Sequence, residues 1–212
     1  MAAAELPPAP FLGDRFAEGL RFASDLHRRQ ARKTATGEEA GVSYLGHLLG
    51  VASIVIDAGG SEDQAIAALL HDAAEDQGGT ATLVRIGRDF GDGVEKIVRD
   101  CSDWLGDGEK PSWLERKQRY VRELPVKDRA SRLVSLADKL YNARAIALDA
   151  RTDGERVWDR FNAERAQVLS YYGALADAFC ASFDGEHELA LADELRATVD
   201  GLAGGEPIAP LL

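Results

Sequence analysis

The sequence lacks any apolar run that approaches the roughly 20 residues needed to span a membrane as a helix. Its first ten residues are rich in alanine and proline, and they lack the basic start and apolar stretch of a secretory signal. These two absences predict a cytoplasmic protein that has no membrane partner.

Cysteine and net positive charge are also scarce. The 212 residues include two cysteines, Cys101 and Cys180, which we expect to be buried free thiols in helices rather than a disulfide. Lysine and arginine number 25 against 36 aspartates and glutamates, for a net charge of −11. This charge disfavours nucleic acid and anionic membranes as partners. An anionic small molecule would have to be captured locally, by a metal ion or a basic cluster.

No segment alternates apolar and polar residues as a half-buried strand would, and no internal repeat is present. Apolar residues recur instead at helical spacing, and a hydrophobic content of 45% suffices for one compact core. We therefore predict an all-α fold with a flexible N-terminus at 1–13, a single domain at 14–203 and a loose tail at 204–212.

The expected helices follow from apolar spacing, caps and glycine or proline stops. A loop is expected at 34–42, and the helices cover residues 14–33, 43–58, 62–76, 80–89, 94–101, 112–124, 129–150, 155–183 and 186–199.

The helix at 62–76 carries the strongest local signal. Ser61 and Gln64 form a capping box at its start, and two glycines follow its end. Its last two turns place four polar residues three or four positions apart, which predicts that they project from one side: His71, Asp72, Glu75 and Asp76.

This arrangement is electrostatically unfavourable for a bare helix. Carboxylates at this spacing repel one another, and the C-terminal end of a helix already carries partial negative charge. A bound cation would reverse both effects. A solvated acidic helix end is the alternative, but the residues follow an apolar run, which favours a metal or catalytic site.

Two other residues could join such a site. His47 lies in the helix at 43–58, and the very short turn after that helix makes the two helices antiparallel neighbours, which places His47 near His71 and Asp72. Asp138 interrupts an apolar stretch, with Asn142 one turn further on the same side. Taken singly, His47 could be a core or surface histidine, and Asp138 could form a buried ion pair.

The densest positive cluster lies at the end of the helix expected at 14–33. It contains Arg28, Arg29, Arg32 and Lys33. Cations at a helix C-terminus complement its dipole, and an anion site is an equally good interpretation.

These residues together resemble a known family over roughly residues 14–179. The matching features are Arg32-Lys33 before a loop, Tyr44, His47, Ala67-Ala-Leu-Leu-His71-Asp72 with Glu75-Asp76, Phe90-Gly91, Ser102-Asp103, and Leu136-Ala-Asp138-Lys-Leu-Tyr-Asn142. The sequence is similar to the HD-domain metal phosphohydrolases, and within them to the RelA/SpoT-type hydrolase domain and the small stand-alone alarmone hydrolases.

The resemblance implies an all-helical HD-domain bundle that removes the 3′-pyrophosphate from ppGpp or pppGpp and releases GDP or GTP. It implies one divalent metal ion, usually manganese, bound by His47, His71, Asp72 and Asp138. It also implies that Glu75 and Asp76 position and deprotonate the attacking water, that Arg32 and Lys33 line the guanosine pocket, and that Asn142 contacts the nucleotide.

Some positions depart from the family pattern. Leu48 stands where relatives generally have proline, and the loop after Lys33 is longer than usual and contains Glu38 and Glu39. Phe161 stands where some stand-alone relatives have a tyrosine, and Trp113 where some have a lysine. Two alternatives therefore stay open: a phosphatase for another nucleotide, such as NADPH or a nucleoside monophosphate, and a silent domain that binds a guanine nucleotide. The sequence does not indicate the oligomeric state.

Overall fold

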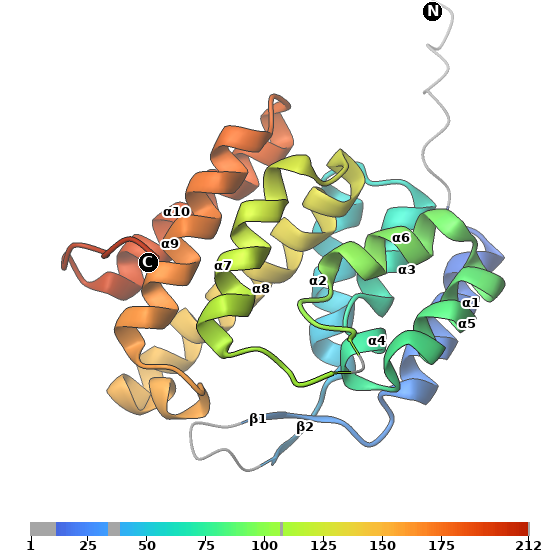
Figure 1. Cartoon of the computed structure of the whole chain (residues 1–212), viewed down its shortest axis with the longest axis horizontal. Helices are drawn as coiled ribbons and strands as arrows, with labels where there is room; N and C mark the ends of the chain where they lie inside the picture. The colour runs from blue at the N-terminus through green and yellow to red at the C-terminus, as the bar shows by residue number, and fades with distance from the viewer. Residues whose placement is uncertain (1–11, 34–38, 107, 212) are drawn as a thin grey trace, which may run out of the picture.

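A computed structural model describes residues 12–33, 39–106 and 108–211, and these form a helical bundle with one small hairpin (Figure 1). The all-α prediction is confirmed. In chain order the elements are α1 (Asp14–Leu26), β1 (Ala31–Lys33), β2 (Glu39–Ser43), α2 (Leu45–Asp57), α3 (Glu62–Leu70), α4 (Ala73–Asp76), α5 (Gly79–Phe90), α6 (Asp92–Cys101), α7 (Trp113–Glu123), η1 (Leu124–Val126), α8 (Arg129–Asp153), η2 (Gly154–Arg160), α9 (Arg165–Ser182) and α10 (Glu186–Ala203). None of the helices described is both long and apolar enough to cross a membrane.

Two apolar clusters share the long helix α8, which runs through the middle of the bundle (Figure 1). The first cluster joins α1, α2, α3, α5 and α6 to residues such as Val134 and Ala137 of α8. The second joins α7, α9 and α10 to Leu136, Leu140 and Ala143 of the same helix. Residues from the middle of α8 are therefore held rigidly between two packed halves.

The helix starts follow the predicted capping chemistry. The Ser61 hydroxyl accepts from the Gln64 N–H while the Gln64 side chain accepts from the Ser61 N–H, and Ser112 and Glu115 form the same reciprocal pair. Both capping boxes are confirmed. Cys101 and Cys180 are free thiols as expected, although both are half-buried rather than buried.

The region after the first helix differs from the prediction. Helix α1 ends at Leu26 rather than at Lys33, and β1 pairs antiparallel with β2, so that 39–42 are strand rather than loop. The Tyr44 N–H donates to the Gln30 carbonyl oxygen at 3.0 Å and closes the hairpin. Strands of three and five residues are too short to show a clear alternation in the sequence. Residues 34–38, with Glu38, lie outside the described residues.

Two helices expected to be continuous are interrupted. The helix predicted at 62–76 stops at Leu70 and resumes at Ala73, with Asp72 between them at φ −95° and ψ −5°. The His71 Nδ1 lies 2.8 Å from the Ala68 carbonyl oxygen, a side-chain to main-chain hydrogen bond that accompanies the break. The helix predicted at 155–183 is divided into η2 and α9.

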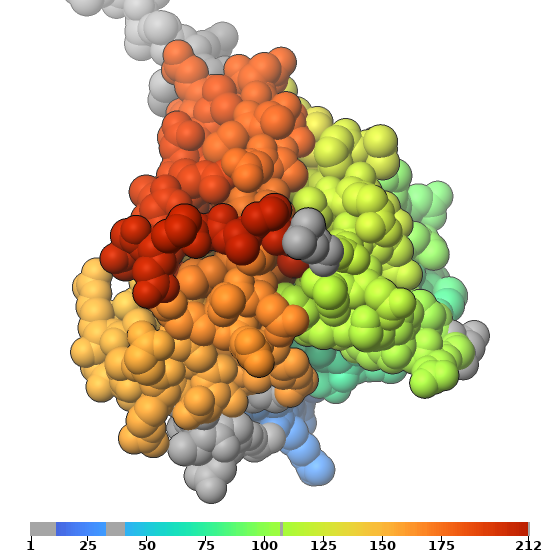
Figure 2. Space-filling view, turned by 60° about the vertical axis from the view of Figure 1, so that its left-hand side comes forward, coloured from blue at the N-terminus to red at the C-terminus, as the bar shows by residue number. Residues whose placement is uncertain are grey.

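The C-terminal segment, expected to be a loose tail, lies across α9 in the structure (Figure 2). Ile208 and Leu211 are partly buried against the second cluster, and Glu206 pairs with Arg165 at 2.9 Å. A methyl group at Gly173 would lie 3.1 Å from Ile208 Cγ2, so the small residue lets the segment approach the helix.

Candidate active site

Three helical segments bring four ligand-type side chains to one point beside α8. His47 comes from the first turn of α2, His71 and Asp72 from the break after α3, and Asp138 from the middle of α8. His47, His71 and Asp138 are 3%, 2% and 5% exposed, so water cannot satisfy their polar atoms. These are the four residues that the sequence analysis expects to meet.

The facing atoms have the spacing of donors around one ion. The Nε2 atoms of His47 and His71 are 3.2 Å apart, and each lies 3.4–3.5 Å from Asp138 Oδ1. Asp72 Oδ2 lies 3.0 Å from the Nε2 of His71 and 3.5 Å from that of His47. Donor atoms bonded to one metal at about 2.1 Å and separated by 90–110° are about 3.0–3.4 Å apart.

The protonation of His71 also suits a metal ligand. Its Nδ1 faces the Ala68 carbonyl oxygen, which can only accept a hydrogen bond, so Nδ1 carries the proton. In the neutral ring this leaves a lone pair on Nε2, and that atom points at His47, Asp72 and Asp138. The donor set therefore fits a divalent cation.

The histidines and carboxylates of this cluster shift one another's pKa values. Burial alone would lower the pKa of His71, but the carboxylates of Asp72 and Asp138 outweigh it and raise that pKa well above its usual value. Burial would raise the pKa of Asp138, but Lys139 and His71 hold it well below the usual range. The two carboxylates therefore stay ionised, as metal ligands must.

Hydrogen bonds from neighbouring side chains orient both carboxylates. Lys139 Nζ donates to Asp138 Oδ2 and Asn142 Nδ2 donates to Asp138 Oδ1, both at 2.6 Å. The Tyr44 hydroxyl donates to Asp72 Oδ2 at 2.5 Å. Asn142, expected to contact a nucleotide, thus already uses its amide N–H on Asp138. Sequence reasoning assigned no role to Tyr44, although it stands three residues before His47.

A cavity of about 390 Å³ opens beside these residues. It brings together three residues predicted for the site, Arg32, Asp76 and Asn142, with four that sequence reasoning missed or left unassigned: Tyr44, Arg160, Phe161 and Tyr172. Lys33 lies next to Arg32 on β1, and its side chain is outside the description. Guanidinium groups and aromatic rings at one cavity suit an anionic ligand with a planar ring.

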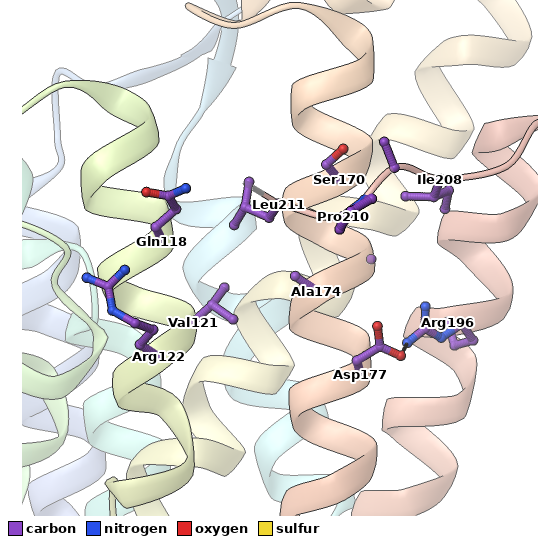
Figure 3. A pocket seen from close by; sticks show the side chains of 12 residues that line it. Gln118, Val121, Arg122, Ser170, Ala174, Asp177, Arg196, Ile208, Pro210 and Leu211 are labelled. Atoms are coloured by element: carbon purple, nitrogen blue, oxygen red, sulfur yellow. Dashed lines mark hydrogen bonds and ion pairs between the residues drawn. The ribbon is translucent and has the colours of Figure 1, made fainter.

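A larger hollow of about 500 Å³ lies elsewhere, between α7, α9, α10 and the C-terminal segment (Figure 3). Leu211 and Pro210 enter it from one side, and the ion pair of Arg196 with Asp177 borders it. It is lined by none of the residues predicted for the site, so size alone does not identify the functional cavity.

Glu75 and Asp76 are adjacent in α4, after the break, and their side chains face different surroundings. Asp76 lines the cavity, where its Oδ2 accepts from Gln30 Nε2 at 2.7 Å, and burial together with Asp72 raises its pKa. Glu75 faces the segment after α6: its Oε2 accepts from the Asp103 N–H at 3.1 Å, and its Oε1 lies 3.6 Å from Lys110 Nζ. Burial, with Asp103, raises the pKa of Glu75 to about 7. The expectation that both project from one side of an unbroken helix is corrected.

Comparison with families and curated proteins gives a consistent result. The family model described as "HD domain" matches residues 19–169. Guanosine-3′,5′-bis(diphosphate) 3′-pyrophosphohydrolase MESH1 of Mus musculus and of Homo sapiens are each 39% identical over 129 residues, which is 60% of this chain and 66% of the relative. The match thus spans slightly less than two thirds of these relatives.

Solved structures agree with the fold. A structure described as a metazoan ortholog of SpoT that hydrolyzes ppGpp has a TM-score of 0.68 at 25% identity and covers 88% of this chain and 96% of its own. The protein lmo0812 from Listeria monocytogenes EGD-e has a TM-score of 0.64 at 27% identity, covering 74% of this chain and 97% of its own.

Proposed function

This chain belongs to the HD domain family, and we propose that it is a metal-dependent hydrolase of guanosine alarmones. The reaction would remove the 3′-pyrophosphate from ppGpp or pppGpp and release GDP or GTP. The relatives' activity supports this substrate, since MESH1 is a guanosine-3′,5′-bis(diphosphate) 3′-pyrophosphohydrolase.

One observation carries the proposal: the donor set of buried His47, His71 and Asp138 with half-buried Asp72 adjoins a cavity with two guanidinium groups. Arg160 lines this cavity and pairs through Nη1 with Asp149 Oδ2 at 2.7 Å, while its Nε and Nη2 are buried with no hydrogen-bond partner in the described part of the chain. Unpaired buried donors are costly, and phosphate oxygens would satisfy them. A protein of net charge −11 needs such local capture to hold a polyanion.

The proposed metal is held by His47, His71, Asp72 and Asp138. Two imidazoles with two carboxylates suit a borderline to hard transition metal, and we propose Mn²⁺. When bound, the ion would supply Lewis-acid chemistry at the phosphoryl group.

Side chains of the cavity would bind the nucleotide. Arg32 and Arg160 would pair with phosphate oxygens, while Phe161 and Tyr172 would pack against the nucleoside. Asn142 would contact the nucleotide from the same wall, and Lys33 would line the guanosine site from β1.

In the hydrolysis, water oxygen bonds to phosphorus and the bond from phosphorus to the 3′ oxygen breaks. The water would give its proton to Glu75, and the 3′ oxygen would take up a proton from solvent as the nucleotide leaves. Because the pKa of Glu75 is about 7, a large share of this carboxyl is ionised at neutral pH and can accept that proton. Asp76, held by Gln30 in the cavity, would orient the attacking water.

The test is a product assay with Mn²⁺ on ppGpp, NADPH and a nucleoside monophosphate, with an EDTA-treated sample and a His71→Ala variant as controls. We expect GDP and pyrophosphate from ppGpp, and no turnover in either control. Faster phosphate release from NADPH or the monophosphate would make this a phosphatase for another nucleotide. Binding of a guanine nucleotide without turnover would indicate a silent domain.

We also propose a cytoplasmic location, because the free thiols Cys101 and Cys180 suit a reducing compartment.

A further inference from the structure

Asp103, two residues after the end of α6, has a buried carboxylate that two cations of α7 hold in place, and a third cation of that helix binds its carbonyl oxygen. Its side chain is 6% exposed, and Oδ2 accepts hydrogen bonds from Arg116 and from Lys117 Nζ, the latter at 2.8 Å. Its carbonyl oxygen accepts from Arg119 Nη2 at 2.5 Å. The start of the segment after α6 is therefore fixed to α7 at both its side chain and its backbone.

The other side of Asp103 faces Glu75. The Asp103 N–H donates to Glu75 Oε2 at 3.1 Å. The second carboxylate oxygen, Asp103 Oδ1, is buried and has no hydrogen-bond partner among the described residues. A buried acceptor without a partner is costly, and a proton carried by the neighbouring Glu75 could provide one.

We propose that Asp103 is a positioning residue for Glu75: it fixes where that carboxyl points and faces it with a permanent negative charge. The inference rests on the water-activating role proposed above for Glu75. Asp103 itself is given no contact with substrate.

The physical reason is the unequal surroundings of two neighbouring carboxyls. Burial would raise the pKa of Asp103, but Lys117 and Arg116 outweigh it and hold that pKa well below the usual range. Asp103 is therefore ionised, and Glu75 is the carboxyl that keeps a proton into the neutral range. Two carboxyls whose environments push their pKa values apart divide the acid and base roles between them.

The charged groups that face Glu75 come from three elements. Asp72 lies one turn before it, and Asp103 and Lys110 come from the segment between α6 and α7. Arg116 and Lys117 of α7 act on it through Asp103. Among these groups, Asp103 has the largest influence after burial itself, so removing its charge is the most direct perturbation.

Asp103→Asn isolates the charge, because asparagine keeps the backbone N–H that donates to Glu75 and nearly the same side-chain volume. A base works above its pKa, so the rate rises with pH through the pKa of Glu75. Loss of the facing negative charge lowers that pKa, and we expect the acid limb of kcat/KM to move down by about 1 pH unit. Asp103→Glu, which keeps the charge, should leave the acid limb close to that of the parent.

The matched control is Asp100→Asn, an identical change three residues earlier. Asp100 pairs with Lys96 and Ser131 instead of facing Glu75. A residue that merely ties the loop to α7 would change stability or KM in Asp103→Asn without moving the pH profile. An acid limb that is the same in Asp103→Asn and the parent would overturn the proposal.

A second readout separates this inference from the proposed function. The carboxyl ¹³C signal of Glu75 is assigned by its loss in Glu75→Gln. It can be titrated whether or not any nucleotide is turned over, in the chain loaded with diamagnetic Zn²⁺ in place of paramagnetic Mn²⁺. We expect its midpoint to fall by about 1 pH unit in Asp103→Asn and to stay in place in Asp100→Asn. Equal midpoints in all three proteins would refute the role of Asp103 even if ppGpp is hydrolysed.

If Asp103→Asn does not fold, Lys117→Gln decides. Removing the Lys117 cation should make the Glu75–Asp103 pair bind its proton more tightly, so the midpoint of the Glu75 titration should move to higher pH. An unchanged midpoint in Lys117→Gln would contradict the proposal.

Discussion

Tyr44→Phe tests whether a residue outside the ligand set tunes the metal. The hydroxyl donates to Asp72 Oδ2 at 2.5 Å, the same oxygen that faces both histidines. The Tyr44 ring stacks on the His27 ring and packs against the His47 ring, with 5.6 Å and 5.2 Å between ring centroids. Because those ring contacts stay in phenylalanine, the change removes one hydrogen bond and little else.

The expected size follows from the surroundings of Asp72. A hydrogen bond to a charged group is worth about 1.5–3 kcal/mol, and about 1.4 kcal/mol corresponds to a tenfold change in affinity. The Asp72 side chain is 25% exposed, so water can replace part of the lost bond and the lower end applies. We expect Tyr44→Phe to weaken Mn²⁺ binding by about 10-fold, within the usual range for such outer partners.

Competition titration with a fluorescent chelator would measure this at fixed pH. Tyr172→Phe is the control, because Tyr172 lines the same cavity and has no hydrogen bond to a proposed ligand in the described chain. Equal metal affinity in Tyr44→Phe and the parent would show that the Tyr44 hydroxyl does not hold Asp72 for the ion.

Four further variants test other parts of the site and its support. Arg32→Ala should lower kcat/KM for ppGpp by ~10-fold or more while the free energy of unfolding changes by under about 1 kcal/mol, because Arg32 lies at the cavity on β1; a large stability loss with unchanged kinetics would contradict nucleotide recognition. Glu75→Gln and Asp76→Asn should each retain metal and stability but slow turnover at saturating substrate by at least ~10²-fold. Near-normal turnover in both would refute the water-activating role. Gly50→Ala would place a methyl group 2.0 Å from Tyr141 Cε2. The cost of such overpacking, about 1–3 kcal/mol, outweighs the roughly 1 kcal/mol that alanine gains in helix propensity. We expect a lower Tm by calorimetry, and an unchanged or higher Tm would contradict the close packing of α2 on α8.

Much of the donor set could be predicted because short-range spacing fixes it. His71 and Asp72 are adjacent, and the tight turn between α2 and α3 brings His47 back beside them. The capping box at Ser61 set the helix start correctly for the same reason. Asp138 comes from a distant helix, and only its polar character within an apolar stretch and the family resemblance indicated it.

The rest depends on contacts that leave no trace in local spacing. The helical pattern continues through residues 71 and 72, so it could not reveal the break there. It also could not show that Glu75 faces Asp103 while the adjacent Asp76 lines the cavity. Arg160 reaches the cavity from the short η2, in a stretch where sequence reasoning expected a continuous helix. Residues that meet only through tertiary packing need the fold before they can be assigned.

Metal stoichiometry tests the central claim most directly. The parent chain and a His47→Ala variant would be loaded with Mn²⁺, separated from free ion by gel filtration and assayed for bound metal. If His47, His71, Asp72 and Asp138 share an ion, the parent should retain about one ion per chain, and His47→Ala should lose most of it together with activity. Full metal occupancy in His47→Ala would contradict a shared site built from α2, the α3–α4 break and α8.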